Sequence, residues 1–183
     1  MKIDMMLRCP ACKSDLSKSG NNFICANRHC GHASSENYFS CIDGVPVLVS
    51  EILCDTVCSS SDAASLIPRS GDGGALKLLK KHLVGESKTT KSNIANFIGR
   101  LKRTNKKPLV LIIGSGEIGS GSDKLYSSEM QIVGLDVYSS PSVDYVADAH
   151  YLPFKDAVFD GVVIQAVLEH VVDPPVVVSE IHR

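Results

Sequence analysis

The chain has 183 residues, of which 44% are hydrophobic and 21% charged, and this composition excludes a disordered, collagen-like or mucin-like protein. No apolar run reaches the roughly 18 residues of a membrane span, and Arg8 interrupts the apolar N-terminus before a signal-peptide core can form. We therefore expect a cytoplasmic protein without membrane contacts, whose seven cysteines stay reduced and in part bind a metal.

Charge is unevenly distributed along the chain, although the net charge is only −1. Residues 1–74 carry six basic and eight acidic side chains, residues 75–107 carry ten and one, and residues 108–183 carry three and eleven. An acidic C-terminal third is a poor surface for nucleic acid, whereas the basic middle suits either contact with phosphate groups or a solvated helix face. The three segments predict three structural units.

Two short cysteine motifs near the N-terminus predict a zinc site. Cys9 and Cys12 form a C-x2-C pair, and Cys25 and Cys30 form a C-x4-C pair. Four thiolates on two short loops suit the tetrahedral, sulfur-rich coordination of zinc. A unit of about 45 residues has too little apolar surface for a core of its own. We therefore expect metal binding to supply most of its folding free energy, on the order of 10 kcal/mol.

The other cysteines and the nearby histidines leave alternatives open. His29 and His32 flank the second pair and are candidates to replace one cysteine ligand, although such histidines are more often solvated loop residues. Cys41 lies in a strand-turn-strand pattern, so for it we expect a place in a small apolar core. Cys54 and Cys58 have no second pair nearby in the sequence and are weak candidates for metal ligands.

The cysteine motifs lie in a wider pattern. The pattern begins with LRCPAC, which contains the first cysteine pair, and ends with IDGVPVLV. The second pair, or second knuckle, ends in Cys-Gly, and a turn at 20–21 and a short strand over 22–24 lie between the two pairs. Residues 7–49 resemble the short zinc ribbons at the N-terminus of bacterial methyltransferases, whose second knuckle usually has two intervening residues where this chain has ANRH. We assign residues 1–50 to a zinc-ribbon domain.

Residues 51–107 are expected to form a linker followed by basic amphipathic helices. The stretch 54–74 is rich in Ser, Asp, Gly and Ala, which is typical of a tether. Apolar residues over 76–83 and 94–101 then recur at spacings of three and four, which predicts two helices separated near Gly85. Their basic residues most simply form a solvated face, and an RNA contact through 75–107 is the alternative.

The last third begins with a continuous apolar run over 109–113, which predicts a strand buried on both faces of a parallel sheet. A glycine turn starting at Gly114 and a helical stretch to about residue 128 follow, and a second strand over 131–135 ends at Asp136. Glycines let a ligand approach the backbone, and a carboxylate at this position accepts hydrogen bonds from ribose hydroxyls. Alone, the pattern equally fits a dinucleotide such as NAD.

The residues that follow distinguish between these ligands. A third strand near 143–146 is followed by ADAHYLPFKDAVFD, a fourth strand over about 159–164, and then LEHVVDP and EIHR. Across residues 109–183 this string closely resembles the class I S-adenosylmethionine-dependent methyltransferases of the small-molecule type. The resemblance implies an α/β fold, in which the zinc ribbon is joined to a partial Rossmann-like parallel sheet over 108–183. The chain departs from the family at Ile112, where an acidic residue is usual, and at Ile118, where the third glycine usually stands.

The resemblance also implies a site for S-adenosylmethionine at the carboxyl ends of the strands. Gly114, Ser115 and Gly116 would lie along the methionine and ribose portion of the cofactor, and Asp136 would bind the ribose hydroxyls.

For the adenine and the methyl group, the resemblance implies three further residues. Asp148 would accept a hydrogen bond from the adenine amino group with Ala149 beside it, and Gln165 would face the methyl group and the acceptor. His170 is a weaker candidate for a base, since its stretch more often shapes the pocket wall, and no catalytic residue is assigned. Asp173 before two prolines predicts the N-cap of a final helix.

The expected activity is therefore methyl transfer to a small-molecule acceptor, with S-adenosylmethionine and zinc as cofactors. Two alternatives stay open: a non-catalytic module that binds a partner through the zinc ribbon, and an NAD-dependent oxidoreductase based on the glycine turn and Asp136 alone. Four strands are fewer than a doubly wound sheet needs. We therefore expect this chain to be part of a longer methyltransferase and weak or inactive by itself.

Overall fold

The computed structural model describes residues 3–34, 36–53, 88–116, 123–126 and 129–183. Three sequence-based expectations lie outside these residues: the Cys54 and Cys58 pair, the linker with the first basic helix, and the end of the glycine turn at 118–119. None of the helices in the described ranges combines the length and apolar character that crossing a bilayer requires.

The N-terminal part consists of short elements joined by tight turns. The 3-10 helix η1 (Ile3–Met6) precedes a hairpin of β1 (Leu16–Ser19) and β2 (Asn22–Cys25), and a second hairpin joins β3 (Cys41–Ile42) to β4 (Val45–Pro46). Gly20 turns the first hairpin with a φ of 61°, a left-handed conformation that costs glycine little. Both the short strand at 22–24 and the strand-turn-strand pattern around Cys41 are confirmed.

A parallel sheet of four strands forms the C-terminal part. Its strands are β5 (Leu109–Ile113), β6 (Gln131–Asp136), β7 (Tyr145–Val146) and β8 (Gly161–Ile164), in the order β7-β6-β5-β8. The central strand β5 pairs in parallel with both β6 and β8. This arrangement confirms the α/β fold class, because parallel neighbours require crossover connections.

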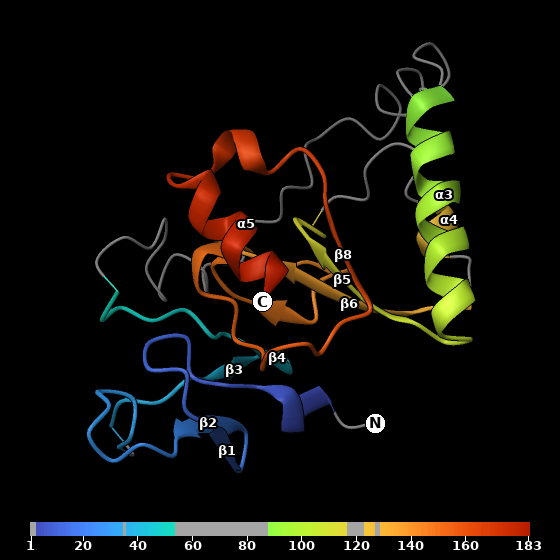
Figure 1. The fold of residues 1–183 in the computed structure, drawn as a ribbon. Coiled ribbons are helices and arrows are strands. Elements are labelled where there is room, and N and C mark those ends of the chain that lie inside the picture. Colours follow the sequence, from blue (N-terminus) through green and yellow to red (C-terminus); the bar gives the residue numbers. More distant parts are fainter. Residues whose placement is uncertain (1–2, 35, 54–87, 117–122, 127–128) are drawn as a thin grey trace.

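Helices cover both faces of this sheet (Figure 1). Val110 and Ile112 of β5 pack in one cluster with residues of α3 (Lys88–Thr104) and α4 (Asp123–Tyr126), whereas Leu111 and Ile113 share a cluster with Val177 of α5 (Pro174–His182). Side chains of a strand alternate between faces, so a strand covered on both must be apolar throughout, as β5 is. The predicted cap is confirmed too, since Asp173 accepts a hydrogen bond from the Val176 N–H.

The cysteine-containing part and the parallel sheet share one apolar core. Leu7, Phe23 and Phe39 belong to the same buried cluster as Leu111 and Phe154. Backbone contacts join the two parts as well: Leu7 bridges Phe154, and Val47 bridges Val146 at the free edge of β7. A chain segment predicted to be a separate unit is thus packed against the sheet, and it lies directly below the sheet in Figure 1.

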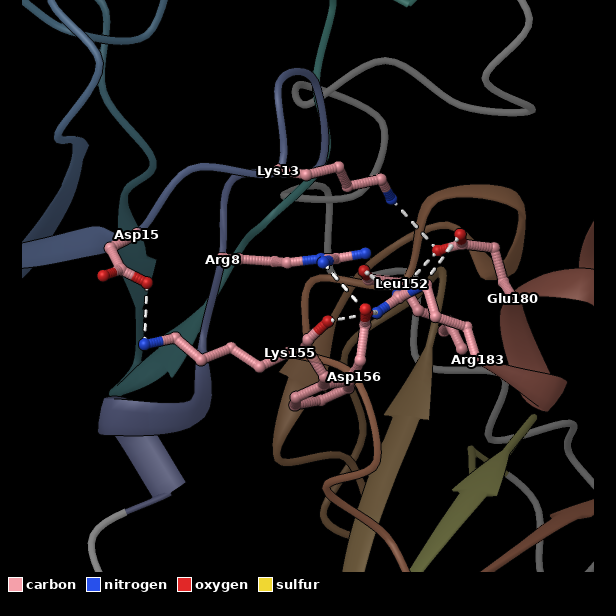
Figure 2. A network of polar contacts seen from close by, with 9 residues as sticks. Arg8, Lys13, Asp15, Leu152, Lys155, Asp156, Glu180 and Arg183 are labelled. Carbon is pink, nitrogen blue, oxygen red and sulfur yellow. Dashed lines mark hydrogen bonds and ion pairs between the residues drawn. The ribbon is translucent and has the colours of Figure 1, made fainter.

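Ion pairs surround this apolar contact (Figure 2). Arg8, directly before Cys9, lies 3.0 Å from Asp156, and Lys13, directly after Cys12, lies 3.0 Å from Glu180 of α5. Arg183 contacts both acidic side chains, at 2.7 Å and 2.9 Å. Two basic residues that flank the first cysteine motif therefore dock it onto acidic side chains of the C-terminal part.

Candidate functional site

The four predicted zinc ligands come together in space. Cys9 and Cys12 lie in the turn before β1, Cys25 is the last residue of β2, and Cys30 lies in the turn that follows. The four sulfur atoms all lie within 4.8 Å of one another, with Cys9 to Cys30 at 3.8 Å and Cys12 to Cys25 at 3.3 Å. Tetrahedral zinc with Zn–S bonds of about 2.3 Å requires sulfur atoms about 3.8 Å apart. The thiols therefore fit a tetrahedral metal ion.

The protein environment shifts the pKa values of these thiols in different directions. Burial raises the pKa of Cys9 and raises that of Cys25 to about 11. Burial acts in the same direction on Cys12, but hydrogen bonds with Ser14, Cys25 and Cys30 together outweigh it and lower the pKa to about 6. Since metal ligation needs thiolates, binding of a divalent ion must release protons from the buried cysteines.

The two candidate histidine ligands do not join this cluster. His32 is buried, its Nε2 lies 2.8 Å from the Ser50 hydroxyl, and its ring stacks on Phe39 with 4.3 Å between centroids. The expectation of a solvated loop histidine is therefore wrong for His32, because the ring fills the core beside the second knuckle. His29 is exposed. Cys41 is half-buried and packs against the shared core, as expected.

A second group of residues lies at the carboxyl ends of β5 and β6. Gly114 has a φ of 78°, and its N–H and that of Ser115 both donate to the Leu135 carbonyl. The Gly116 N–H donates to Oδ2 of Asp136 at 2.9 Å, and a Cβ at position 116 would lie 2.7 Å from that oxygen. A side chain at 116 would therefore displace the Asp136 carboxylate from the turn.

The side chains beside this turn point in different directions. Ser115 is buried and its Oγ lies against Gly134 of β6, 2.7 Å from where a Cβ would stand, so only its backbone faces the turn. Asp136 is half-buried, and its Oδ1 accepts from the Tyr138 N–H at 3.3 Å. The turn thus presents glycine backbone and one carboxylate at the edge of the sheet.

Asp148 lies one strand further along the same edge. It follows β7, whose last residue, Val146, pairs with Asp136, and it precedes the 3-10 helix η2 (Ala149–Tyr151). Oδ1 of Asp148 accepts from the His150 N–H at 2.8 Å and contacts the His150 Nδ1 at 2.6 Å. Oδ2 is buried and has no hydrogen-bond partner among the residues that the structure describes. A buried carboxylate oxygen without a donor is costly, which indicates a place for a ligand donor.

The segment after β8 contributes the opposite side of the glycine turn. The Gln165 carbonyl lies 4.0 Å from where a Cβ of Gly114 would stand, and Cγ2 of Val167 lies closer still. The 3-10 helix η3 (Leu168–His170) then forms the expected turn into α5, with the His170 side chain exposed. The Gln165 backbone therefore lies beside the turn, its predicted role at the methyl group stays a prediction, and Val167 is a neighbour that the sequence did not indicate.

His150 is the other residue that sequence reasoning missed. It is buried against Asp148, and its Nε2 accepts a hydrogen bond from the Asp173 N–H at 3.1 Å. Nothing in its spacing distinguishes it from a solvated histidine, because the partner Asp173 is 23 positions away. Its place beside a candidate ligand carboxylate in ADAHYLPF was the one available signal.

Comparison with known proteins agrees with this geometry. Residues 111–183 match the family model described as a methyltransferase domain. No curated protein matches the chain. The matched segment includes most of β5, the glycine turn, Asp136 and Asp148, and so covers all the residues that meet at the edge of the sheet. The C-terminal part of this chain therefore carries a match to a methyltransferase domain.

Proposed function

We propose that this protein transfers a methyl group from S-adenosylmethionine to a small-molecule acceptor, and that the carboxyl edge of the sheet over 108–183 binds the cofactor. The observation that carries the proposal is the buried Oδ2 of Asp148, which has no partner within the described part of the chain and lies in the segment that matches a methyltransferase domain. S-adenosylmethionine supplies a methyl group on a positively charged sulfur, which is already activated for transfer to a nucleophile.

The residues present fit the adenosine part of that cofactor. The adenine 6-amino group is a donor of the kind that Asp148 Oδ2 lacks. Asp136 supplies a carboxylate whose remaining lone pairs suit the ribose hydroxyls. Gly116, with no side chain, lets a ligand lie against the turn, and Ala149 adds a small buried residue next to Asp148. Adenosine would then span the ends of β5, β6 and β7.

The methionine end is assigned to the glycine turn and to the segment after β8. Gly114 and Ser115 present backbone there, and Val167 lies over Gly114, so its side chain must rotate to admit a ligand. We place Gln165 on the acceptor side, because its carbonyl lies 4.0 Å from where a Cβ of Gly114 would stand. The main contribution of these residues to rate is alignment, since holding two reactants in line lowers the entropic cost of their encounter.

A small-molecule acceptor is favoured over RNA by the position of the basic residues. The described basic side chains at the end of α3, Arg100, Lys102 and Arg103, precede the amino end of β5. The proposed cofactor edge lies at the carboxyl end of the same strand, and the charge of the C-terminal third is acidic. RNA bound at the C-terminal end of α3 would therefore lie at the wrong edge of the sheet for methyl transfer.

Zinc has a structural role in this proposal. Four cysteine ligands leave no open position for a substrate, which is typical of structural zinc sites. We assign residues 1–50 to a zinc ribbon that stabilises the edge of β7, and residues 108–183 to the domain that binds the cofactor.

Calorimetric titration of the full 183-residue chain with S-adenosylhomocysteine tests this function. We expect binding in the wild type, and Asp136→Ala should weaken it by about 10- to 100-fold, as loss of hydrogen bonds to a charged group predicts. Glu129→Ala is the matched control, because Glu129 is exposed and precedes β6. It removes the same charge without touching the turn.

The alternatives give different results in the same protein. Stabilisation against heat by NADH but not by S-adenosylmethionine would indicate an oxidoreductase. If neither compound raised the melting temperature and calorimetry detected no binding, the methyltransferase proposal would be wrong and a scaffold module would be favoured.

A further inference from the structure

The hydrogen bonds around His150 determine which of its ring nitrogens carries the proton. The Asp173 backbone N–H donates to Nε2 at 3.1 Å, so Nε2 must present a lone pair. In the neutral ring the proton then resides on Nδ1, which lies 2.6 Å from Oδ1 of Asp148. Nδ1–H therefore donates to Asp148, and the imidazole is neutral in this arrangement.

The same hydrogen bonds fix the orientation of the Asp148 carboxyl group. Oδ1 accepts from two donors of one residue, the His150 backbone N–H at 2.8 Å and its Nδ1–H. Both donors are satisfied on that oxygen, and Oδ2 is a buried acceptor without a partner in the described ranges. Side-chain exposure is 5% for Asp148 and 6% for His150, so water does not loosen the pair.

The position of His150 is itself held from a distance. Asp173 is the N-cap of α5 and accepts from the Val176 N–H, so its backbone is fixed at the start of that helix. The N–H that Asp173 directs at His150 thus ties η2 to α5, which also contact each other elsewhere along their length. The contacts therefore run from the start of α5, through the imidazole of His150, to the carboxylate of Asp148.

We infer that His150 is a positioning residue that makes the site select a 6-amino purine over a 6-oxo purine. This inference rests on the proposed function, in which Asp148 faces adenine. Oδ2 of Asp148, held in one direction, can accept a hydrogen bond from the adenine amino group. The carbonyl oxygen of hypoxanthine has no hydrogen to donate at that position, so two acceptor oxygens would face each other. Sites that hydrogen-bond one ligand group discriminate against analogues that lack it, because a buried polar group is then left unpaired.

Loss of the Nδ1 donor predicts a change in selectivity rather than a uniform loss of affinity. In His150→Phe the ring volume is kept but both nitrogens are lost, so Oδ1 of Asp148 keeps only the backbone N–H of residue 150 as a donor and Oδ2 is held less firmly in one direction. In His150→Asn the side-chain amide takes the place of Nδ1–H, although it cannot reach Asp173. Selectivity should therefore fall in the first variant and be largely kept in the second.

The experiment compares S-adenosylhomocysteine with S-inosylhomocysteine by calorimetry in all three proteins. We expect the wild type to prefer the adenine compound by about tenfold or more, His150→Asn to keep most of that ratio, and His150→Phe to reduce it to about threefold or less. A purely structural role would weaken both compounds equally and leave the ratio unchanged in His150→Phe. That outcome would overturn the inference.

A second measurement tests the hydrogen bonds of His150 without any ligand. It needs only the wild-type chain, so it remains available if His150→Phe does not fold. Long-range 1H–15N correlation spectra of the wild-type chain should show His150 protonated on Nδ1 and not on Nε2, and the inference is overturned if Nε2 carries the proton. Failure of the proposed function gives a different result from failure of this inference. If the proposed function is wrong, neither compound binds the wild type, and both proposals are wrong. Binding of the adenine compound with an unchanged ratio in His150→Phe removes only the role of His150.

Discussion

The N-terminal cysteine unit and the C-terminal parallel sheet obtain their stability in different ways. In the sheet, β5 contributes five consecutive buried residues and helices cover both faces. In the cysteine unit, strands of two to four residues surround four clustered thiols, and the largest buried side chains, Phe23 and Phe39, face a core shared with the sheet. The sheet relies on its own apolar strands, whereas the unit relies on its neighbour and has four thiols placed to hold a metal.

This difference indicates which part depends on the other. The cysteine unit covers the edge of β7, where Val47 bridges Val146 and the Leu48 N–H donates to the Val146 carbonyl. An uncovered sheet edge presents free backbone groups that invite aggregation. Loss of the metal should therefore harm the sheet at its β7 edge first, close to Asp148.

Removal of the metal should have the largest effect on the difference in stability between the two regions. We expect one zinc per purified chain, and Cys12→Ser should abolish stoichiometric zinc and unfold residues 1–50, because a structural zinc contributes on the order of 10 kcal/mol in such units. Atomic absorption and circular dichroism measure the two effects. Cys41→Ser is the control, since Cys41 lies outside the cluster. Folded wild-type protein with far less than one metal per chain would contradict the zinc assignment.

Shortening Phe154 should have the next largest effect, because this residue lies where the two regions meet. Phe154 is buried, bridges Leu7, and contacts Tyr145 and Phe159 edge to face. Phe154→Ala should lower the free energy of unfolding by about 3–5 kcal/mol.

The shape of the unfolding curve sharpens this test. In the wild type we expect one transition by calorimetry, since the regions share a core, and Phe154→Ala should separate it into two. Two transitions in the wild type itself would show that the regions are energetically independent.

The smallest effect concerns the ion pair between Lys13 and Glu180. Burial acts to raise the pKa of Glu180, but hydrogen bonds from Arg183 and Lys13 outweigh it and hold the pKa below the ordinary 4.5. A lowered carboxyl pKa stabilises the fold above about pH 4.5, and this contribution is lost as the pH falls through the lower, folded-state value.

Glu180→Gln should therefore lower stability by about 1 kcal/mol or less at pH 7, as expected for partly exposed pairs, and the difference from wild type should vanish in acid. Denaturant titrations between about pH 3 and pH 7 measure it. Glu169→Gln is the control, because Glu169 is exposed. A difference that persists unchanged at the lowest pH would mean that Glu180 contributes through packing and not through its charge.

Local pattern was enough to predict the elements and their chemistry. The apolar run over 109–113, the alternation around Cys41 and the Asp173 cap each depend on residues a few positions apart, so the strands, turns and helix start were predictable. The spacing of the four cysteines likewise predicted their cluster, because two short loops can bring four thiols together with little help from the rest of the fold.

Contacts over long sequence separations were decided only by the tertiary structure. Lys13 and Glu180 are 167 positions apart, and His150 and Asp173 are 23 apart, so no periodicity reveals either pair. The sequence alone determined a cysteine cluster and a parallel sheet with carboxylates at its edge. Packing decided that the two share a core, that His32 is buried, and that one oxygen of Asp148 has no partner among the residues described, because burial and hydrogen-bond partners arise from the whole fold.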